Sequence, residues 1–374
     1  MKHSLAVLTI AFSILAVPMA AADHSPKKMM RNMKAYSQLG MSGKLGTYDV
    51  NVAQFGSLPK AAKTNIDNKK FNKIFGDKLN LAAIVMKGDD VVFERYNSKR
   101  KIHSNTPLLG MSMSKTAISA AVGALLCDGK IASLDDVAGA YSSTLKASPY
   151  ADIKIRHILQ MNSGVSPLGR DDEKRFNQKA RGVTDKFAGK ANIREALQFY
   201  KKAARKPASQ MNYHSTDSLA LSILVEEVAG TPLASVFHDK LYTKFGQSGY
   251  MHWTADKAGT TVSFSDLTMT ARDWAHFGKY LMQEKKAKSC LGAFFNEGVA
   301  KAVATGKTNG SKYGFQSWVF PVNGKDAMVM QGHGGQFIVL DETTDTVLLT
   351  ISLNENYKAG NLFSNIHKFA EKLN

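Results

Sequence analysis

The chain has 374 residues, and its 49 lysines and arginines outnumber its 31 aspartates and glutamates, which gives a formal net charge of +18. A chain of this length can bury a large core, as one composite domain or as two lobes. The basic residues lie in short scattered clusters, without a zinc-binding pattern, an aromatic RNA-binding signature or a long basic arm, so we do not expect nucleic acid as a partner.

The N-terminal segment has the anatomy of a secretory signal peptide. A basic start precedes an apolar run at residues 5–19, and three alanines that match a cleavage site follow it. A membrane anchor is the alternative, but the run is short for a span and contains Pro18. We therefore predict a signal peptide at residues 1–22 and a single periplasmic or secreted domain at 23–374. Its basic surface could associate weakly with anionic components of the cell envelope.

The segments that follow alternate between extended and helical patterns. Residues 23–60 are basic and rich in methionine, and we expect an extended arm there. Two β-prone runs at 81–85 and 91–96 are joined by a short turn sequence, which predicts a hairpin. A small-residue apolar run over 113–126, followed by Asp128 and Gly129, predicts a buried helix.

Helical patterns then dominate to about residue 246. They cover 155–160, 193–204 and 218–229, and the last of them ends at Gly230. A loop at 163–190, dense in charge and glycine, interrupts them and could overhang a cleft.

Strand patterns return near the C-terminus. They are predicted at 316–322, 327–331, 336–340 and 346–353, and an amphipathic helix is expected at 362–373. The order favours an α+β fold in which an antiparallel sheet flanked by helices is interrupted by an all-helical lobe. We place the sheet lobe at about 60–111 and 255–374, the helical lobe at about 112–254, and the site in the cleft between them.

The two cysteines, Cys127 and Cys290, leave one question open. An oxidising compartment would permit a bridge between them, but the sequence does not show whether they are close enough. The ten histidines are dispersed and form no metal-ligand pattern, so we predict no metal and no other cofactor.

A serine and a lysine three residues apart, Ser112 and Lys115, stand at the start of the predicted apolar helix. Positions i and i+3 share a helix face, so the amine can lie beside the hydroxyl. A lysine desolvated against a helix has a depressed pKa and can take the serine proton. The S-x-x-K pattern occurs at four other places, but those lie in polar or proline-containing stretches that resemble solvated loops.

Two further stretches are candidates for the same site. Tyr213 and Ser215 lie just before the predicted helix at 218–229, where a tyrosine can project into a cleft and relay a proton. A half-buried packing tyrosine is the alternative. The second stretch is Gln331-Gly332-His333-Gly334-Gly335-Gln336, at the start of an apolar strand. Glycines there suggest close approach of a backbone or ligand, and a glycine-rich hairpin with an incidental histidine is the alternative.

Three sequence elements thus follow one another along the chain: Ser112-x-x-Lys115, Tyr213-x-Ser215, and the HGG element His333-Gly334-Gly335. In this order they resemble the serine β-lactamase or penicillin-recognising family, in its class C-like branch. Connecting sequence at 133–136, 155–159, 162–164 and 269–273 is also similar to that family, and the resemblance covers most of residues 80–372. It implies the β-lactamase/DD-peptidase fold.

The resemblance also implies roles for residues. Ser112 is expected to be the acylated nucleophile, Lys115 its proton acceptor and Tyr213 the partner base. The backbone N–H groups of Ser112 and Gln336 are expected to form the oxyanion hole. Ser215 stands where many relatives have asparagine.

The HGG element differs from the Lys-Thr-Gly of true β-lactamases, which loses a cation and a hydroxyl that hold the β-lactam carboxylate. This favours the amidase and esterase members, such as the 6-aminohexanoate-dimer hydrolases. We therefore expect an exported serine hydrolase for an ester or amide. The alternatives are a D-Ala carboxypeptidase, a β-lactamase, and an inactive protein that binds peptidoglycan or peptides.

Overall fold

The computed structural model describes residues 51–55, 66–67, 69–76, 78–165, 192–197, 203–255, 259–307 and 310–353. Four predicted segments lie wholly or mostly outside these residues. They are the signal peptide at 1–22, the arm at 23–60 apart from one strand, the loop at 163–190 beyond residue 165, and the helix at 362–373.

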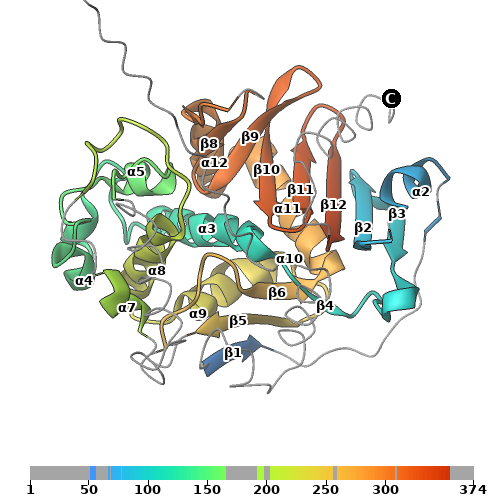
Figure 1. Cartoon of the computed structure of the whole chain (residues 1–374), viewed down its shortest axis with the longest axis horizontal. Helices are drawn as coiled ribbons and strands as arrows, with labels where there is room; N and C mark the ends of the chain where they lie inside the picture. Colours follow the sequence, from blue (N-terminus) through green and yellow to red (C-terminus); the bar gives the residue numbers. More distant parts are fainter. Residues whose placement is uncertain are drawn as a thin grey trace, which may run out of the picture.

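Eight antiparallel strands form the main sheet, in the order β3-β2-β12-β11-β10-β9-β8-β7 (Figure 1). Their bounds are β2 Asn80–Lys87, β3 Asp90–Tyr96, β7 Val303–Ala304, β8 Lys312–Gly314, β9 Ser317–Val322, β10 Lys325–Gly332, β11 Gln336–Asp341 and β12 Thr346–Ser352. The predicted strands are confirmed, with slightly different ends, and so is the antiparallel sheet flanked by helices. The early hairpin joins the late strands through β2 and β12, where Ile84 lies opposite Leu349.

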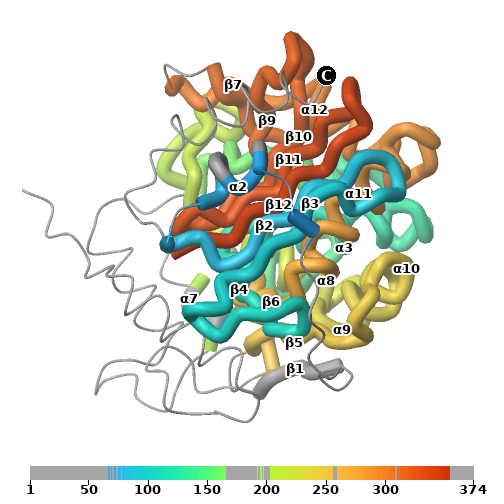
Figure 2. The backbone as a smooth tube through the Cα atoms, turned by 90° about the vertical axis from the view of Figure 1, so that its right-hand side faces the viewer, coloured from blue at the N-terminus to red at the C-terminus, as the bar shows by residue number. Residues whose placement is uncertain are grey.

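The main sheet is buried on both faces. Along β2, Ala82 and Ile84 pack into one apolar cluster, while Ala83 and Val85 pack into the other. Helix α11 (Ala271–Ala287) lies along the first face, and α12 (Cys290–Ala300) contacts β8 and β10 (Figure 2). On the second face, Phe71 and Phe75 of α2 (Lys69–Phe75) belong to the apolar cluster. Successive side chains of a strand point to opposite faces of the sheet. Because both faces are apolar here, all residues of β2 except the last are buried.

Between β4 and β5, the described residues form helices and short turns, with one isolated bridge between Val137 and Lys154. The bounds are η2 Met111–Met113, α3 Ser114–Cys127, η3 Ala138–Ala140, α4 Ser143–Lys146, α5 Ile155–Leu159, α7 Ile193–Ala196, α8 Ser215–Ala229, α9 Leu233–Phe237, η5 His238–Tyr242 and α10 Thr243–Phe245. The predicted end of α8 at Gly230 is confirmed, because that glycine caps the helix with a φ of 71°.

The helix predicted at 193–204 is confirmed at its start and wrong at its end. Helix α7 covers Ile193–Ala196, residues 198–202 lie outside the described residues, and residues 203 and 204 are not helical. The backbone N–H groups of Ala204 and Arg205 donate instead to the carbonyl of Gly164. This contact holds the chain there against the loop after α5.

A second, four-stranded sheet was not predicted. Its order is β1-β5-β6-β4, with β1 Asn51–Phe55, β4 Pro107–Leu109, β5 Met251–Ala255 and β6 Leu267–Thr270. The 3-10 turn η1 (Ser98–Arg100) connects β3 toward β4. Because β4 leads directly into η2 and α3, this small sheet fixes where the Ser112 segment begins.

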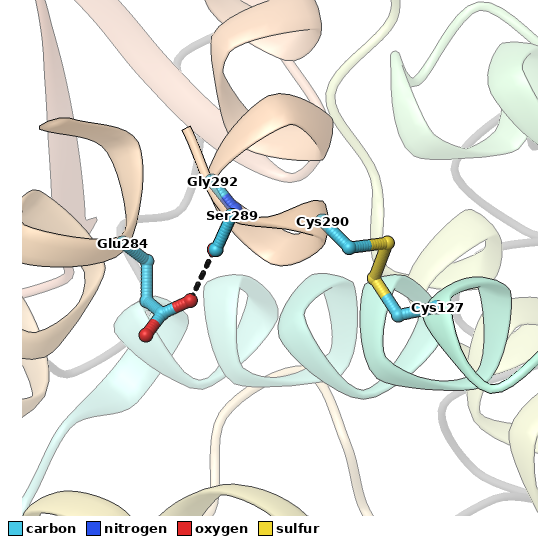
Figure 3. The surroundings of a disulfide bond; sticks show 5 residues. All are labelled: Cys127, Glu284, Ser289, Cys290 and Gly292. Carbon is cyan, nitrogen blue, oxygen red and sulfur yellow. Dashed lines mark hydrogen bonds between the residues drawn. A yellow bond between two sulfur atoms is a disulfide. The ribbon is translucent and has the colours of Figure 1, made fainter. Parts of the chain in front are cut away.

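The two cysteines form a disulfide. Cys127 at the end of α3 and Cys290 at the start of α12 have Cα atoms 5.8 Å apart (Figure 3). Ser289 caps α12, since its hydroxyl accepts from the Gly292 N–H at 3.0 Å. The bridge thus ties the helix that follows Ser112 to a helix of the sheet lobe, which decides the question that the sequence left open.

Among the described helices, no single one has the length and apolar character needed to cross a membrane. One bent pair, Ser215–Ala229 with Leu233–Phe245, meets that requirement by length and composition only.

Candidate active site

Ser112 lies in a single 3-10 turn, η2, directly before α3. Two hydrogen bonds of Ser114 hold this turn. The Ser114 hydroxyl donates to the Met111 carbonyl at 2.7 Å and accepts from the Leu267 N–H of β6 at 3.1 Å. Met111 has a φ of 50°, a left-handed conformation that is costly for a residue with a side chain. The surrounding contacts therefore impose the backbone geometry immediately before Ser112.

Gly110 allows this arrangement. A Cβ atom at that position would lie 2.2 Å from the Trp274 ring of α11, too close for any side chain. The Trp274 indole N–H donates to the Leu108 carbonyl at 3.0 Å, so the ring is fixed. The start of the Ser112 turn is thus packed directly on a helix of the sheet lobe.

Lys115 is buried in the first turn of α3, with 2% of its surface exposed. Its Nζ lies 3.1 Å from Ser112 Oγ and donates to the Phe264 carbonyl at 2.7 Å. Burial lowers the pKa of Lys115 to about 7, although the negative charge of Asp266 opposes that shift. Near neutral pH a substantial fraction of this amine is uncharged and able to accept a proton from the hydroxyl beside it.

Tyr213 is 38% exposed, and it is the one aromatic ring among the exposed large hydrophobic residues of the described part of the chain. The ring stacks on Trp318 with 5.4 Å between centroids and meets Tyr313 edge-on at 5.7 Å. Its centroid is 5.3 Å from Lys115 Nζ. One side of the tyrosine ring is therefore packed, as the alternative of a half-buried packing tyrosine predicted, and the other side is open to the site.

A buried polar cluster lies behind Tyr213. Asp217, in the first turn of α8, is fully buried and accepts from the Tyr150 and Ser163 hydroxyls at 2.8 and 2.6 Å. Its carboxylate lies 3.6 Å from Nε2 of His214. Burial raises the pKa of Asp217 to about 8 and lowers the pKa of His214 to about 3, so both groups favour their neutral forms at neutral pH. These contacts fix the residues on either side of Ser215.

The HGG element forms the turn between β10 and β11. His333, Gly334 and Gly335 connect the two strands, and the two glycines have φ values of 86° and 93°. Only glycine adopts such angles without strain. Gln336 begins β11 opposite Gly332, and its side chain donates to the His333 carbonyl at 2.6 Å.

The close backbone approach predicted from the glycines is present at Gly332. A Cβ there would lie 2.4 Å from the carbonyl oxygen of Gly110. The β10 strand therefore runs directly against the turn that carries Ser112. The sequence analysis treated a glycine-rich hairpin and a close backbone approach as alternatives, and the structure contains both.

A pocket of about 250 Å³ brings these elements together, and its lining residues come from five separate parts of the chain. They are Ser112, Tyr213, Lys307, Trp318, Gln331, Gly332 and His333. Lys115 lies beneath Ser112. Ser215, Gly334, Gly335 and Gln336 lie within three residues of a lining residue in sequence but do not line the pocket themselves.

Two lining residues were missed by the sequence analysis. Trp318 falls within a predicted strand, and Lys307 lies in the chain between β7 and β8. Neither belongs to a recognisable local pattern, because they reach the pocket only through the folding of the sheet. Ser112, Lys115 and Tyr213 together offer a hydroxyl, an amine with a lowered pKa beside it and a phenol, a set suited to nucleophilic attack on a carbonyl.

Comparisons with known proteins agree with this geometry. The beta-lactamase family model matches residues 71–366. A Bacillus anthracis structure assigned provisionally as a 6-aminohexanoate-dimer hydrolase is 19% identical with a TM-score of 0.73, over 91% of this chain and 94% of that one. A penicillin-binding protein from Bacillus halodurans is 16% identical with a TM-score of 0.61, over 80% and 99%. No curated protein sequence matches the chain.

A family VIII carboxylesterase has a TM-score of 0.62 at 12% identity, over 81% of this chain and 95% of that chain. At such identities these structures are similar to the chain in fold alone. The family match and the shared fold together support the resemblance drawn from the three sequence elements.

Proposed function

The chain belongs to the beta-lactamase family of serine hydrolases, and on that premise we propose that it cleaves an ester or amide through an acyl-enzyme on Ser112. One observation carries the proposal. The amine of Lys115, whose pKa is lowered to about 7 by burial, lies 3.1 Å from the Ser112 hydroxyl in an open pocket. A serine needs such a base because its own proton leaves only with difficulty.

The reaction has two halves. Neutral Lys115 accepts the Ser112 proton while Oγ bonds to the carbonyl carbon, and the negative charge moves to the carbonyl oxygen. The bond to the leaving group then breaks, and that group takes a proton relayed through Lys115 and Tyr213. In the second half water bonds to the acyl carbon, and its proton passes by the same route to Ser112 Oγ as the bond between that carbon and Oγ breaks. This releases the carboxylic acid product and restores the Ser112 hydroxyl.

The oxyanion would be held by backbone N–H groups. The family resemblance implies those of Ser112, in the turn before α3, and Gln336, the first residue of β11. Ser112 lines the pocket, and Gln336 pairs with the lining residue Gly332, which places it next to the pocket. Preorganised donors of this kind are a large contribution to catalysis in acyl transfer.

The substrate class that we favour is a short ester or a linear amide, in the manner of the 6-aminohexanoate-dimer hydrolases and related esterases. The turn at His333-Gly334-Gly335 supports this choice, since it lacks the lysine and hydroxyl found in true β-lactamases. D-Ala carboxypeptidase and β-lactamase activities remain the alternatives that a substrate screen separates.

We also propose that the protein works outside the cytoplasm. The predicted signal peptide at residues 1–22 supports this, and so does the Cys127–Cys290 disulfide, because such bonds persist mainly in oxidising compartments.

Labelling with a fluorophosphonate probe tests the mechanism. We expect a mass gain on the peptide that contains Ser112, hydrolysis of p-nitrophenyl butyrate, and loss of both in Ser112→Ala with an unchanged circular dichroism spectrum. A wild-type protein that folds but neither labels nor hydrolyses any ester, amide or nitrocefin would refute the proposal and favour a binding protein.

A further inference from the structure

The pocket contains a cation that none of the three sequence elements supplies. Lys307 lies between β7 and β8 and lines the same pocket as Ser112 and His333. Its Nζ lies 4.4 Å from the centroid of the Trp318 ring. A cation over an indole face is held by the ring's electrostatic field, while its N–H groups stay available to a ligand.

Within the part of the chain that the structure describes, no carboxylate matches the charge of Lys307. No described aspartate or glutamate lines the pocket, and none pairs with Lys307. Neighbouring lysines differ in this respect, since Lys301 pairs with Glu297 at 2.8 Å and Lys312 pairs with Asp326 at 2.6 Å. The pocket therefore has an excess of positive charge beside the nucleophile.

Lys307 is exposed, so its ammonium can be reached by a ligand that enters the pocket. Partial burial lowers the pKa of Lys307, and the side chain still lines the pocket beside Ser112. A charge-assisted hydrogen bond from lysine to a carboxylate is the interaction that such a site favours.

We propose that Lys307, held over Trp318, binds an anionic group of the substrate, so that the enzyme prefers esters or amides that carry a carboxylate. The inference rests on the proposed hydrolase function and adds its substrate class. It also amends the reasoning from sequence, which found no lysine on the HGG turn and expected no cation to hold a carboxylate. Lys307 supplies that cation from another part of the chain.

Matched substrates separate this inference from the proposed function. On the acyl side, p-nitrophenyl hexanoate is compared with mono-p-nitrophenyl adipate, which has a carboxylate in place of the terminal methyl group. On the leaving-group side, methyl m-acetoxybenzoate is compared with m-acetoxybenzoate. Hydrolysis of the neutral esters reports the hydrolase function alone, and the anionic-to-neutral ratio of kcat/KM reports the subsite.

We expect Lys307→Gln to lower that ratio by about 10-fold or more in at least one pair, the size expected for losing a hydrogen bond to a charged group. Lys307→Glu should lower it further, because it places a like charge beside the substrate. The neutral esters should stay within about 2-fold of wild type in both variants. Raising the salt concentration should lower the ratio for wild type and much less for Lys307→Gln.

Lys130→Gln is the matched control, since it removes the same charge from an exposed position at the far end of α3. Its ratio should equal that of wild type. If wild type cleaves the neutral esters but Lys307→Gln leaves both ratios unchanged, the subsite is refuted and the hydrolase function stands. If wild type cleaves none of the esters and does not label on Ser112, both proposals fail.

Discussion

At the scale of single residues, the lowered pKa of Lys115 predicts a pH dependence. A general base must be unprotonated, so kcat/KM should rise with pH through about 7 and level off above it. A lysine with its ordinary pKa of 10.5 would give a rise only in strongly alkaline solution. The measurement is kcat/KM for a neutral ester from pH 5 to pH 9.

Asp266 provides the control for this assignment. Its negative charge raises the pKa of Lys115, so Asp266→Asn should move the midpoint of the profile to lower pH. Histidine also titrates near neutral pH, and His333→Gln should leave the midpoint in place. If the midpoint of the pH profile is unchanged in Asp266→Asn but the pH dependence is lost in His333→Gln, the titrating group is His333 and not Lys115.

Tyr213 predicts a loss of rate without a loss of fold. Tyr213→Phe keeps the ring that stacks on Trp318 and removes only the hydroxyl, so the free energy of unfolding should change by less than about 1 kcal/mol. Loss of a general acid–base group should lower kcat by about 10²–10⁴-fold with a smaller effect on KM. The measurement is kcat and KM on p-nitrophenyl butyrate beside urea unfolding.

Tyr313→Phe is the matched control, because Tyr313 packs in the same aromatic group but does not line the pocket. Its kcat should remain close to that of wild type. If Tyr213→Phe retained more than about half of the wild-type kcat, the packing alternative would be correct.

At the scale of elements, Gln316 connects three helices to the turn before β9. Its side-chain N–H group donates to the carbonyls of Ile158 and Leu159 in α5, and its oxygen accepts from the Ser218 hydroxyl of α8 at 2.7 Å. Its backbone carbonyl accepts from Thr116 of α3 at 3.2 Å. Removing the side chain would leave the buried Ser218 hydroxyl without its acceptor and would break the two side-chain bonds to α5, although the Ile158 and Leu159 carbonyls still accept from the backbone N–H groups of Met161 and Gln316.

We therefore predict that Gln316→Ala lowers the free energy of unfolding by about 2–4 kcal/mol, measured by urea denaturation. Gln283→Ala, at an exposed position of α11, is the control and should stay within about 0.5 kcal/mol of wild type. Equal losses in the two variants would show that the contacts of Gln316 contribute little.

The elements that could be predicted from the sequence are those whose apolar pattern matches their burial in the fold. The runs that became β2 and β12 are continuous apolar segments because both faces of the sheet are covered. Helix α11 was missed although its signals are present, with Thr270 as the N-cap and buried apolar residues at 274, 277 and 281. Strands β4 and β6 have three and four residues, too few to show a period.

The residues of the site also fall into two groups, those that a local sequence pattern predicts and those that only the fold brings to the pocket. Ser112 and Lys115 are three residues apart, so local helix geometry already brings them together. Lys307 and Trp318 reach the pocket only because β7, β8 and β9 are placed beside the Ser112 turn. That placement depends on sheet register over the whole chain, which no local pattern contains.

At the scale of the whole molecule, the disulfide links the two parts that form the pocket. Cys127 ends α3 and Cys290 begins α12, 163 residues apart in sequence, so the bond restricts a long loop of the unfolded chain (Figure 3). The chain-entropy model gives about 5 kcal/mol for such a loop, and structure in the denatured state reduces this figure. Peptide mapping without reduction should recover the Cys127–Cys290 pair.

We predict that the double variant Cys127→Ser with Cys290→Ser loses about 2–5 kcal/mol of unfolding free energy and keeps kcat within about 2-fold of wild type. Activity should persist because the disulfide lies at the far end of α3, more than three turns of helix from Ser112. Urea denaturation with and without a reductant is the measurement, and reductant should lower the stability of wild type but not of the variant. An equal response of the two proteins to reductant would mean that the bond does not form in solution, and it would remove one support for function outside the cytoplasm.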